Sequence, residues 1–110
     1  MLEIMEMYYH LTETENIPRI LCEGLLPMIG PRSSEFGEDV PRVYLFGSIT
    51  DVKNAGWLID SFESDDLSVV EVQIPKESSS EVCIRKGAAE FEWYAETKIP
   101  PKFIRSTREI

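Results

Sequence analysis

The chain has 110 residues, a length typical of one domain with one hydrophobic core. Its hydrophobic fraction of 43% is that of a globular protein, and no apolar run approaches the roughly 20 residues needed to cross a bilayer. The net charge of −9 disfavours nucleic-acid binding, because phosphates repel negative charge and no stripe of Lys and Arg with interleaved aromatics is present. The first ten residues carry two glutamates and no lysine or arginine, unlike a signal peptide. We therefore expect a single domain, residues 1–110, in the cytoplasm, with no contact with a membrane.

The two cysteines, Cys22 and Cys83, are far apart in the sequence and form no CxxC pair. In a reducing compartment they are expected to be small buried apolar residues. Two cysteines and one histidine do not supply the four soft ligands of a structural zinc site. No metal site is expected.

Residues 3–12 (EIMEMYYHLT) are predicted to form a strand, because apolar and polar side chains alternate with a period of two. The alternation predicts an apolar face and a more polar face, formed respectively by Met5, Met7, Tyr9 and Leu11 and by Glu6, Tyr8, His10 and Thr12. His10, the only histidine, lies on the more polar face near the end of this strand.

A helix is predicted over residues 15–23 (ENIPRILCE). Thr12 or Thr14 can cap its N-terminus, and Pro18 is tolerated in its first turn. Gly24 follows where a helix C-terminus favours a left-handed residue. The inner face of this helix is predicted to consist of Ile17, Ile20 and Leu21.

The middle of the chain combines a long loop, a strand and a second helix. Residues 25–41 are dense in Gly, Pro, Ser and charge, which predicts a loop of a length that often carries function. Residues 42–48 (RVYLFGS) predict a strand, and residues 48–62 predict a helix capped by Ser48. One side of that helix is predicted to consist of Ile49, Val52, Gly56 and Ile59.

The last part of the chain is predicted to be mainly β. Its elements are a β-branched strand over 67–75, a turn over 76–80, an extended piece over 81–86, a strand over 89–96, and a proline-pinned turn with a final strand over 98–110. This order predicts an α+β domain in which two helices pack on a mostly antiparallel sheet.

Three residues are candidates for chemistry, although each has a simpler explanation in isolation. A lone histidine on a strand, such as His10, is more often a surface or hydrogen-bonded core residue. Tyr44 is compatible with core or interface packing. Glu92 lies in mid-strand among heavy aromatics, where a charge often protects a sheet edge.

Four motifs give these residues a common interpretation. In chain order they are YYHLTETENIPRILCEGLLP, RVYLFGSITDVKNA, VVEVQIP and EFEWYAETKIPPKFI, which together run through residues 8–104. The series resembles the ADP-ribosyltransferase fold, in the branch whose active site is a His, a Tyr and a Glu on three successive strand elements. The first motif is similar to that branch's opening Y-H-x-T strand and I-x-x-x-G-L helix end, and the last to its glutamate strand and I-P-P-x-x-I closing element. The resemblance implies a split sheet and NAD⁺ as co-substrate.

The resemblance also implies a role for each residue. Glu92 would stabilise the positive charge that develops on the ribose as nicotinamide leaves, as in other glycosyl transfers. Tyr44 would stack on nicotinamide, and His10 would hydrogen-bond the ribose on the adenosine side. Thr12 would contact the same sugar, and Arg32, in the long loop, would bind the pyrophosphate. His10 is therefore expected to face Tyr44 and Glu92 across a nucleotide cleft.

Other features of the sequence limit this interpretation. Glu90 precedes Glu92 by two residues, as in the E-x-E of arginine-modifying relatives, but this spacing occurs often by chance in so acidic a chain. No Gly-rich phosphate loop is present. RNA 2′-phosphotransferase activity, which the wider fold also supports, is disfavoured by the net charge of −9.

Two functions from different classes follow. The first is a mono-ADP-ribosyltransferase, of the kind found in toxin-like or phage effectors, that modifies a macromolecule, a protein rather than a nucleic acid. The second is a non-catalytic module of the same fold that binds a nucleotide or a basic protein partner. The complete set of His10, Tyr44 and Glu92 favours the enzyme, because a module without catalysis is expected to have lost at least one of them. A structural protein that mimics nucleic acid would explain the charge but not the ordered motifs.

Overall fold

The computed structural model describes residues 5–27, 41–60, 62, 66–75, 82–87 and 91–110. Most of the loop predicted over 25–41 and the turn predicted over 76–80 lie outside these residues. The predicted α+β class with an antiparallel sheet is confirmed, since all the paired strands are antiparallel.

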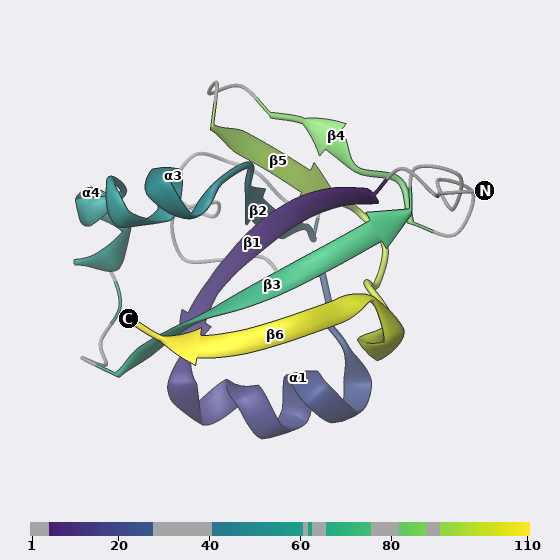
Figure 1. The fold of residues 1–110 in the computed structure, drawn as a ribbon, viewed down its shortest axis with the longest axis horizontal. Helices are drawn as coiled ribbons and strands as arrows, with labels where there is room; N and C mark the ends of the chain where they lie inside the picture. Colours follow the sequence, from purple (N-terminus) through teal and green to yellow (C-terminus); the bar gives the residue numbers. More distant parts are fainter. Residues whose placement is uncertain (1–4, 28–40, 61, 63–65, 76–81, 88–90) are drawn as a thin grey trace.

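Six strands form one sheet in the order β4-β5-β2-β1-β3-β6 (Figure 1). They are β1 (Met5–Glu13), β2 (Val43–Phe46), β3 (Leu67–Pro75), β4 (Arg85–Lys86), β5 (Glu92–Ala95) and β6 (Ile104–Glu109). The strand predicted from alternation at the start of the chain is therefore a central strand. The C-terminal β6 is an edge strand that carries Arg105, Arg108 and Glu109, and charged side chains on an edge strand discourage pairing with other chains.

The helices are short. They are α1 (Ile17–Glu23), preceded by a 3₁₀ turn η1 (Thr14–Asn16), then α3 (Ile49–Lys53), α4 (Gly56–Ile59) and a 3₁₀ turn η3 (Pro101–Phe103). The single helix predicted over 48–62 is wrong, because the chain breaks between α3 and α4. At the break the Ala55 amide donates to the carbonyl of Val52, three residues back, and Gly56, a weak helix former, follows.

The ends of α1 and α3 show which capping predictions hold. Gly24 ends α1 with a φ of 86°, and its amide donates to the Ile20 carbonyl, as the sequence predicts. The Ser48 hydroxyl accepts from the Asp51 amide at 3.1 Å and caps α3, also as predicted. The predicted cap of α1 is wrong, because its N-cap residue is Asn16 and no side chain caps it.

Both faces of the sheet are covered, so the prediction of one apolar and one polar face on the first strand is only half right. Tyr8 and Thr12, on the face predicted to be more polar, are each 6% exposed. The α1-side cluster consists of Tyr8, Ile20, Leu25, Val43, Leu45, Val70, Val72, Ile74, Val82, Ala95, Ile99 and Phe103. The α3-side cluster consists of Leu11, Phe46, Val52, Ala55, Leu67 and Val69, with Tyr9, Ile49, Ile59, Phe62 and Phe91 packed against it. A more polar strand face is buried here because α1 packs over it.

Three residues predicted to be buried are exposed. Cys22 and Cys83 are both exposed free cysteines, so the expectation of buried thiols is wrong. Leu21, assigned to the inner face of α1, is 50% exposed. α1 is only seven residues long and rests on the sheet mainly through Ile20 and, partly, Ile17, so Leu21 and Cys22 face outward. In the described part of the chain, no helix is long and apolar enough to cross a bilayer.

Candidate functional site

The three candidate residues lie on three strands that are neighbours in the sheet. His10 is in β1, Tyr44 in β2 and Glu92 in β5, and β2 lies between the other two. Tyr44 pairs with Tyr94 across β2 and β5, and Phe46 pairs with Glu92. These partners are 50 and 46 residues apart in the sequence, so the pairing of β2 with β5 is what brings Glu92 close to Tyr44.

The register of the strands determines which face each side chain occupies. Tyr9 pairs with Phe46, and Phe46 pairs with Glu92, so these three side chains share the α3 side of the sheet. Tyr44 lies two residues from Phe46 and belongs to the same side. His10 pairs with Val70, a member of the α1-side cluster, and so lies on the opposite side. The structure thus brings Tyr44 and Glu92 to one face and places His10 on the other. The prediction that His10 faces Tyr44 and Glu92 across one cleft is therefore wrong, because the register of β1 with β3 turns the His10 side chain toward the α1 side.

His10 is connected to Tyr44 through the main chain. Its Nδ1 lies 2.8 Å from the carbonyl oxygen of Tyr44. A carbonyl oxygen only accepts hydrogen bonds, so Nδ1 carries the proton and donates. Burial lowers the pKa of His10 below its ordinary value, and the bond to Tyr44 opposes that shift to a smaller extent. The ring is therefore neutral near pH 7, and its Nε2 is an acceptor.

Glu92 is packed against a glycine at the end of β4. The Gly87 amide donates to the Glu92 carbonyl at 2.8 Å, and the Lys86 ammonium lies 3.4 Å from the same oxygen. A Cβ on Gly87 would lie 2.6, 2.7 and 2.9 Å from Cγ, Cδ and Oε1 of Glu92. No side chain fits at position 87 unless the Glu92 side chain moves. Gly87 therefore leaves the space that the carboxyl group of Glu92 occupies.

Arg42 adds a cation over Tyr94, the strand partner of Tyr44. Its guanidinium lies 4.3 Å from the centroid of the Tyr94 ring, and its Nε lies 3.9 Å from a carboxylate oxygen of Glu96. The sequence prediction does not include Arg42. The signal in the sequence is its position two residues before Tyr44, which strand alternation places on the same side of the sheet.

Of the other residues singled out in the sequence, the structure describes Thr12. The Thr12 hydroxyl oxygen accepts from the Asn16 side-chain amide at 3.2 Å, and Thr12 shares the His10 side of β1. Arg32 and Glu90 lie outside the described residues.

Within the part of the chain that the structure describes, neither a metal-binding cluster nor one of the two hollows given below coincides with the three candidate residues. Among the described residues, no group of three or more His, Cys, Asp and Glu side chains could hold a metal ion. A hollow of about 600 Å³ lies beside α3, α4 and the end of β6, and a second hollow, of about 370 Å³, lies beside η3 and the start of β6. His10, Tyr44 and Glu92 line neither of these two hollows.

The sequence was compared with models of known protein families and with curated proteins. No protein-family model matches the chain, and no curated protein matches it. The resemblance to ADP-ribosyltransferases therefore rests on the four motifs in the sequence.

Proposed function

We propose that the protein is a mono-ADP-ribosyltransferase that uses NAD⁺ as co-substrate. The observation that carries the proposal is the arrangement of the three candidate residues on the adjacent strands β1, β2 and β5, with Tyr44 and Glu92 on one face. An ADP-ribosyltransferase-like split sheet is part of the same proposal, and the single register pair between β1 and β2 supports it. The proposed target is a macromolecule, a protein rather than a nucleic acid, and the proposed compartment is the cytoplasm.

The proposed reaction is a glycosyl transfer. The bond between C1′ of the ribose and the nicotinamide nitrogen breaks, and nicotinamide leaves with the bonding electron pair. A nucleophilic atom of the target forms a new bond to C1′ and loses its proton to solvent or to a nearby base. Positive charge develops on the ribose in the transition state, and the Glu92 carboxylate stabilises it more strongly than it stabilises the ground state.

The other residues bind and orient the dinucleotide. Tyr44 stacks on the nicotinamide ring from the Glu92 side of the sheet. The Nε2 of His10, left as an acceptor because Nδ1 binds Tyr44, accepts from a hydroxyl group of the adenosine-side ribose. Because His10 lies on the other face of the sheet, this proposal requires the dinucleotide to pass the β1–β2 junction, where one register pair joins the strands. Arg32 binds the pyrophosphate. Thr12, which is 6% exposed and accepts from the Asn16 side chain, is too buried to contact the sugar and is left out of the proposed site. Arg42 is a second candidate for the pyrophosphate, since its guanidinium lies over Tyr94, the direct partner of Tyr44.

Incubation with labelled NAD⁺ and a cell lysate tests the proposal. The wild-type protein is expected to transfer label to a macromolecule and to release nicotinamide. Glu92→Gln is expected to reduce both by about a hundredfold or more, the cost of removing one preorganised electrostatic group. Glu23→Gln, which makes the same charge change on the exposed surface of α1, is the matched control and should retain activity.

Two outcomes contradict the proposal. Label transfer that is equal in the wild-type protein and in Glu92→Gln would remove Glu92 from the mechanism. Binding of NAD⁺ without any turnover would instead favour the non-catalytic nucleotide-binding module.

A further inference from the structure

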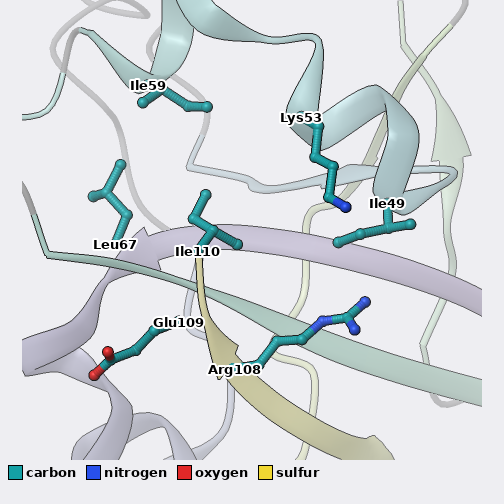
Figure 2. A pocket seen from close by; sticks show the side chains of 7 residues that line it. All are labelled: Ile49, Lys53, Ile59, Leu67, Arg108, Glu109 and Ile110. Atoms are coloured by element: carbon teal, nitrogen blue, oxygen red, sulfur yellow. The ribbon is translucent and has the colours of Figure 1, made fainter.

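A hollow lies on the α3 side of the sheet, where α3 and α4 approach the ends of β3 and β6 (Figure 2). We call it the α3–β6 hollow. Its lining consists of Ile49, Lys53, Ile59, Leu67, Arg108, Glu109 and Ile110. Its volume of about 600 Å³ is within the range of small-molecule sites.

The lining of this hollow is mainly aliphatic. Leu67 is 4% exposed and belongs to the α3-side cluster, with Ile49 and Ile59 packed against that cluster. Ile110, in contrast, is 48% exposed, and its amide donates to the Leu67 carbonyl. The hollow is therefore a place where the apolar core reaches the surface, and an apolar group seated there would remove aliphatic surface from water.

Two cations lie at the same side of the hollow. Figure 2 shows the Lys53 ammonium and the Arg108 guanidinium on one side of it, while the Glu109 carboxylate points away from both. The strand pairing explains this separation. Arg108 pairs with Val69 of the α3-side cluster, and Glu109 pairs with Ser68 on the opposite face. Neither Lys53 nor Arg108 forms an ion pair with a described residue.

The combination of an aliphatic lining and two cations selects a class of ligand. An anion is repelled by most of a chain with 20 acidic and 11 basic residues, but it is attracted locally by Lys53 and Arg108. The guanidinium of Arg108 can bind both oxygens of a carboxylate, and the ammonium of Lys53 can add a third contact. We propose that the α3–β6 hollow binds a small amphipathic anion, namely a carboxylate carried by a short aliphatic or aromatic body. This site shares no residue with the proposed transferase site and does not depend on it.

Titration of ¹⁵N-labelled protein tests this proposal with three probes that share one tail: octanoate, octylammonium and octanol. Octanoate is expected to shift the amide signals of Ile49, Lys53, Leu67 and Arg108. Octylammonium and octanol are expected to bind about tenfold or more weakly, since each lacks the charge-assisted hydrogen bonds to the two cations.

Substitution of both cations tests the charged half of the site. In Lys53→Gln/Arg108→Gln, the affinity for octanoate is expected to fall about tenfold, while the affinity for octanol is unchanged. Lys98→Gln/Arg105→Gln removes the same charge from exposed residues outside the hollow and should bind octanoate as the wild-type protein does.

The probe comparison in the wild-type protein does not require any variant to fold. Equal shifts by octanoate and octylammonium would overturn the proposal, because the cations would then select nothing. Shifts centred outside the hollow, or an equal loss of octanoate binding in both double variants, would also overturn it. An acidic peptide that binds at the hollow where octanoate does not would assign the hollow to a different occupant and overturn the proposal too.

Discussion

Along one edge of β1 every residue from Met5 to Glu13 has a partner on β3, whereas along the other edge the register with β2 consists of the pair Tyr9–Phe46. The β1–β3 side carries a complete antiparallel ladder, extended by β6. The β1–β2 side holds two parts of the sheet together with little main-chain pairing. The candidate residues His10, Tyr44 and Glu92 are gathered on this second side.

The difference indicates that the two sides have different roles: one holds the backbone by main-chain pairing, and the other carries the candidate side chains. The complete ladder fixes the backbone on the β1–β3 side, whereas on the β1–β2 side a side chain takes over part of the main-chain pairing. His10 crosses the β1–β2 junction, because its Nδ1 donates to a carbonyl of β2 where a strand amide would otherwise do so. The imidazole thus has a structural role in addition to the role proposed for it in binding NAD⁺. The following variants separate the two sides and the two roles.

The largest expected effect is on the β1–β2 side, which carries Glu92, and is produced by Gly87→Ala. The new methyl group would occupy the place of the Glu92 side chain and displace its carboxyl group. Label transfer from NAD⁺ is expected to fall by up to about a hundredfold, the cost of misplacing a catalytic group by about 1 Å.

Gly56→Ala is the control for this substitution, because a Cβ at Gly56 meets no atom within 4 Å. Its activity and its thermal unfolding should match those of the wild-type protein or be slightly improved. If Gly87→Ala were as active as Gly56→Ala, the packing of Glu92 on Gly87 would have no part in the proposed mechanism.

Val70→Ala tests the β1–β3 side of the sheet. Val70 is fully buried in β3 between β1 and β6, so its truncation is expected to lower the free energy of unfolding by about 2–3 kcal/mol. Amide hydrogen exchange then compares the two sides. The β3 amides are expected to lose protection by about a hundredfold, because they exchange through global unfolding. The β2 amides, which exchange through local opening, should lose less. An equal loss in both strands would show that the sheet opens as one unit.

The two roles of His10 are separated by His10→Asn and His10→Gln. The asparagine amide reaches the position of Nδ1 and can keep the bond to the Tyr44 carbonyl, so the unfolding free energy should be nearly retained. The glutamine amide reaches further and loses that bond, which is expected to cost about 1 kcal/mol. A raised KM for NAD⁺ in His10→Asn, with stability retained, would support ligand binding by Nε2. A KM that is unchanged in His10→Asn would leave His10 with the structural role alone.

The smallest expected effect is the dependence of stability on pH. Burial lowers the pKa of His10, so the unfolded chain takes up a proton at a higher pH than the folded protein does. The contribution of His10 to stability is complete above the unfolded-state pKa of about 6.5 and is lost as the pH falls below it toward the lowered folded-state pKa. Chemical denaturation between pH 7.5 and about 5.5, above the range where most carboxylates titrate, should show this loss in the wild-type protein and not in His10→Asn. Parallel profiles for the two proteins would contradict the assignment.

Local signals in the sequence were sufficient for several elements. The alternation in residues 3–12 predicts β1, the Ser48–Asp51 spacing predicts the cap of α3, and Gly24 predicts the end of α1. Each of these depends on interactions within a few residues of one another, where spacing and residue type carry most of the information.

What depends on distant pairing was not predictable from the same signals. Alternation assigns His10 to one face of its strand, but only the β1–β2 register relates that face to Tyr44 and Glu92. The exposure of Cys22 depends on how α1 is rotated on the sheet, and the burial of Tyr8 depends on α1 lying over it. The contact between Glu92 and Gly87 depends on the turn of the β4–β5 pair.

The position of β1 in the sheet also has a consequence for folding during synthesis on the ribosome. Among the six described strands β1 is synthesised first, its neighbours β2 and β3 are synthesised later, and β6 follows them. β2 offers β1 one register pair, so until β3 emerges most of the main-chain groups of Met5 to Glu13 have no partner in the sheet. The nascent chain thus passes through an interval in which its central strand can pair with another chain, and chaperone binding would be most useful during that interval.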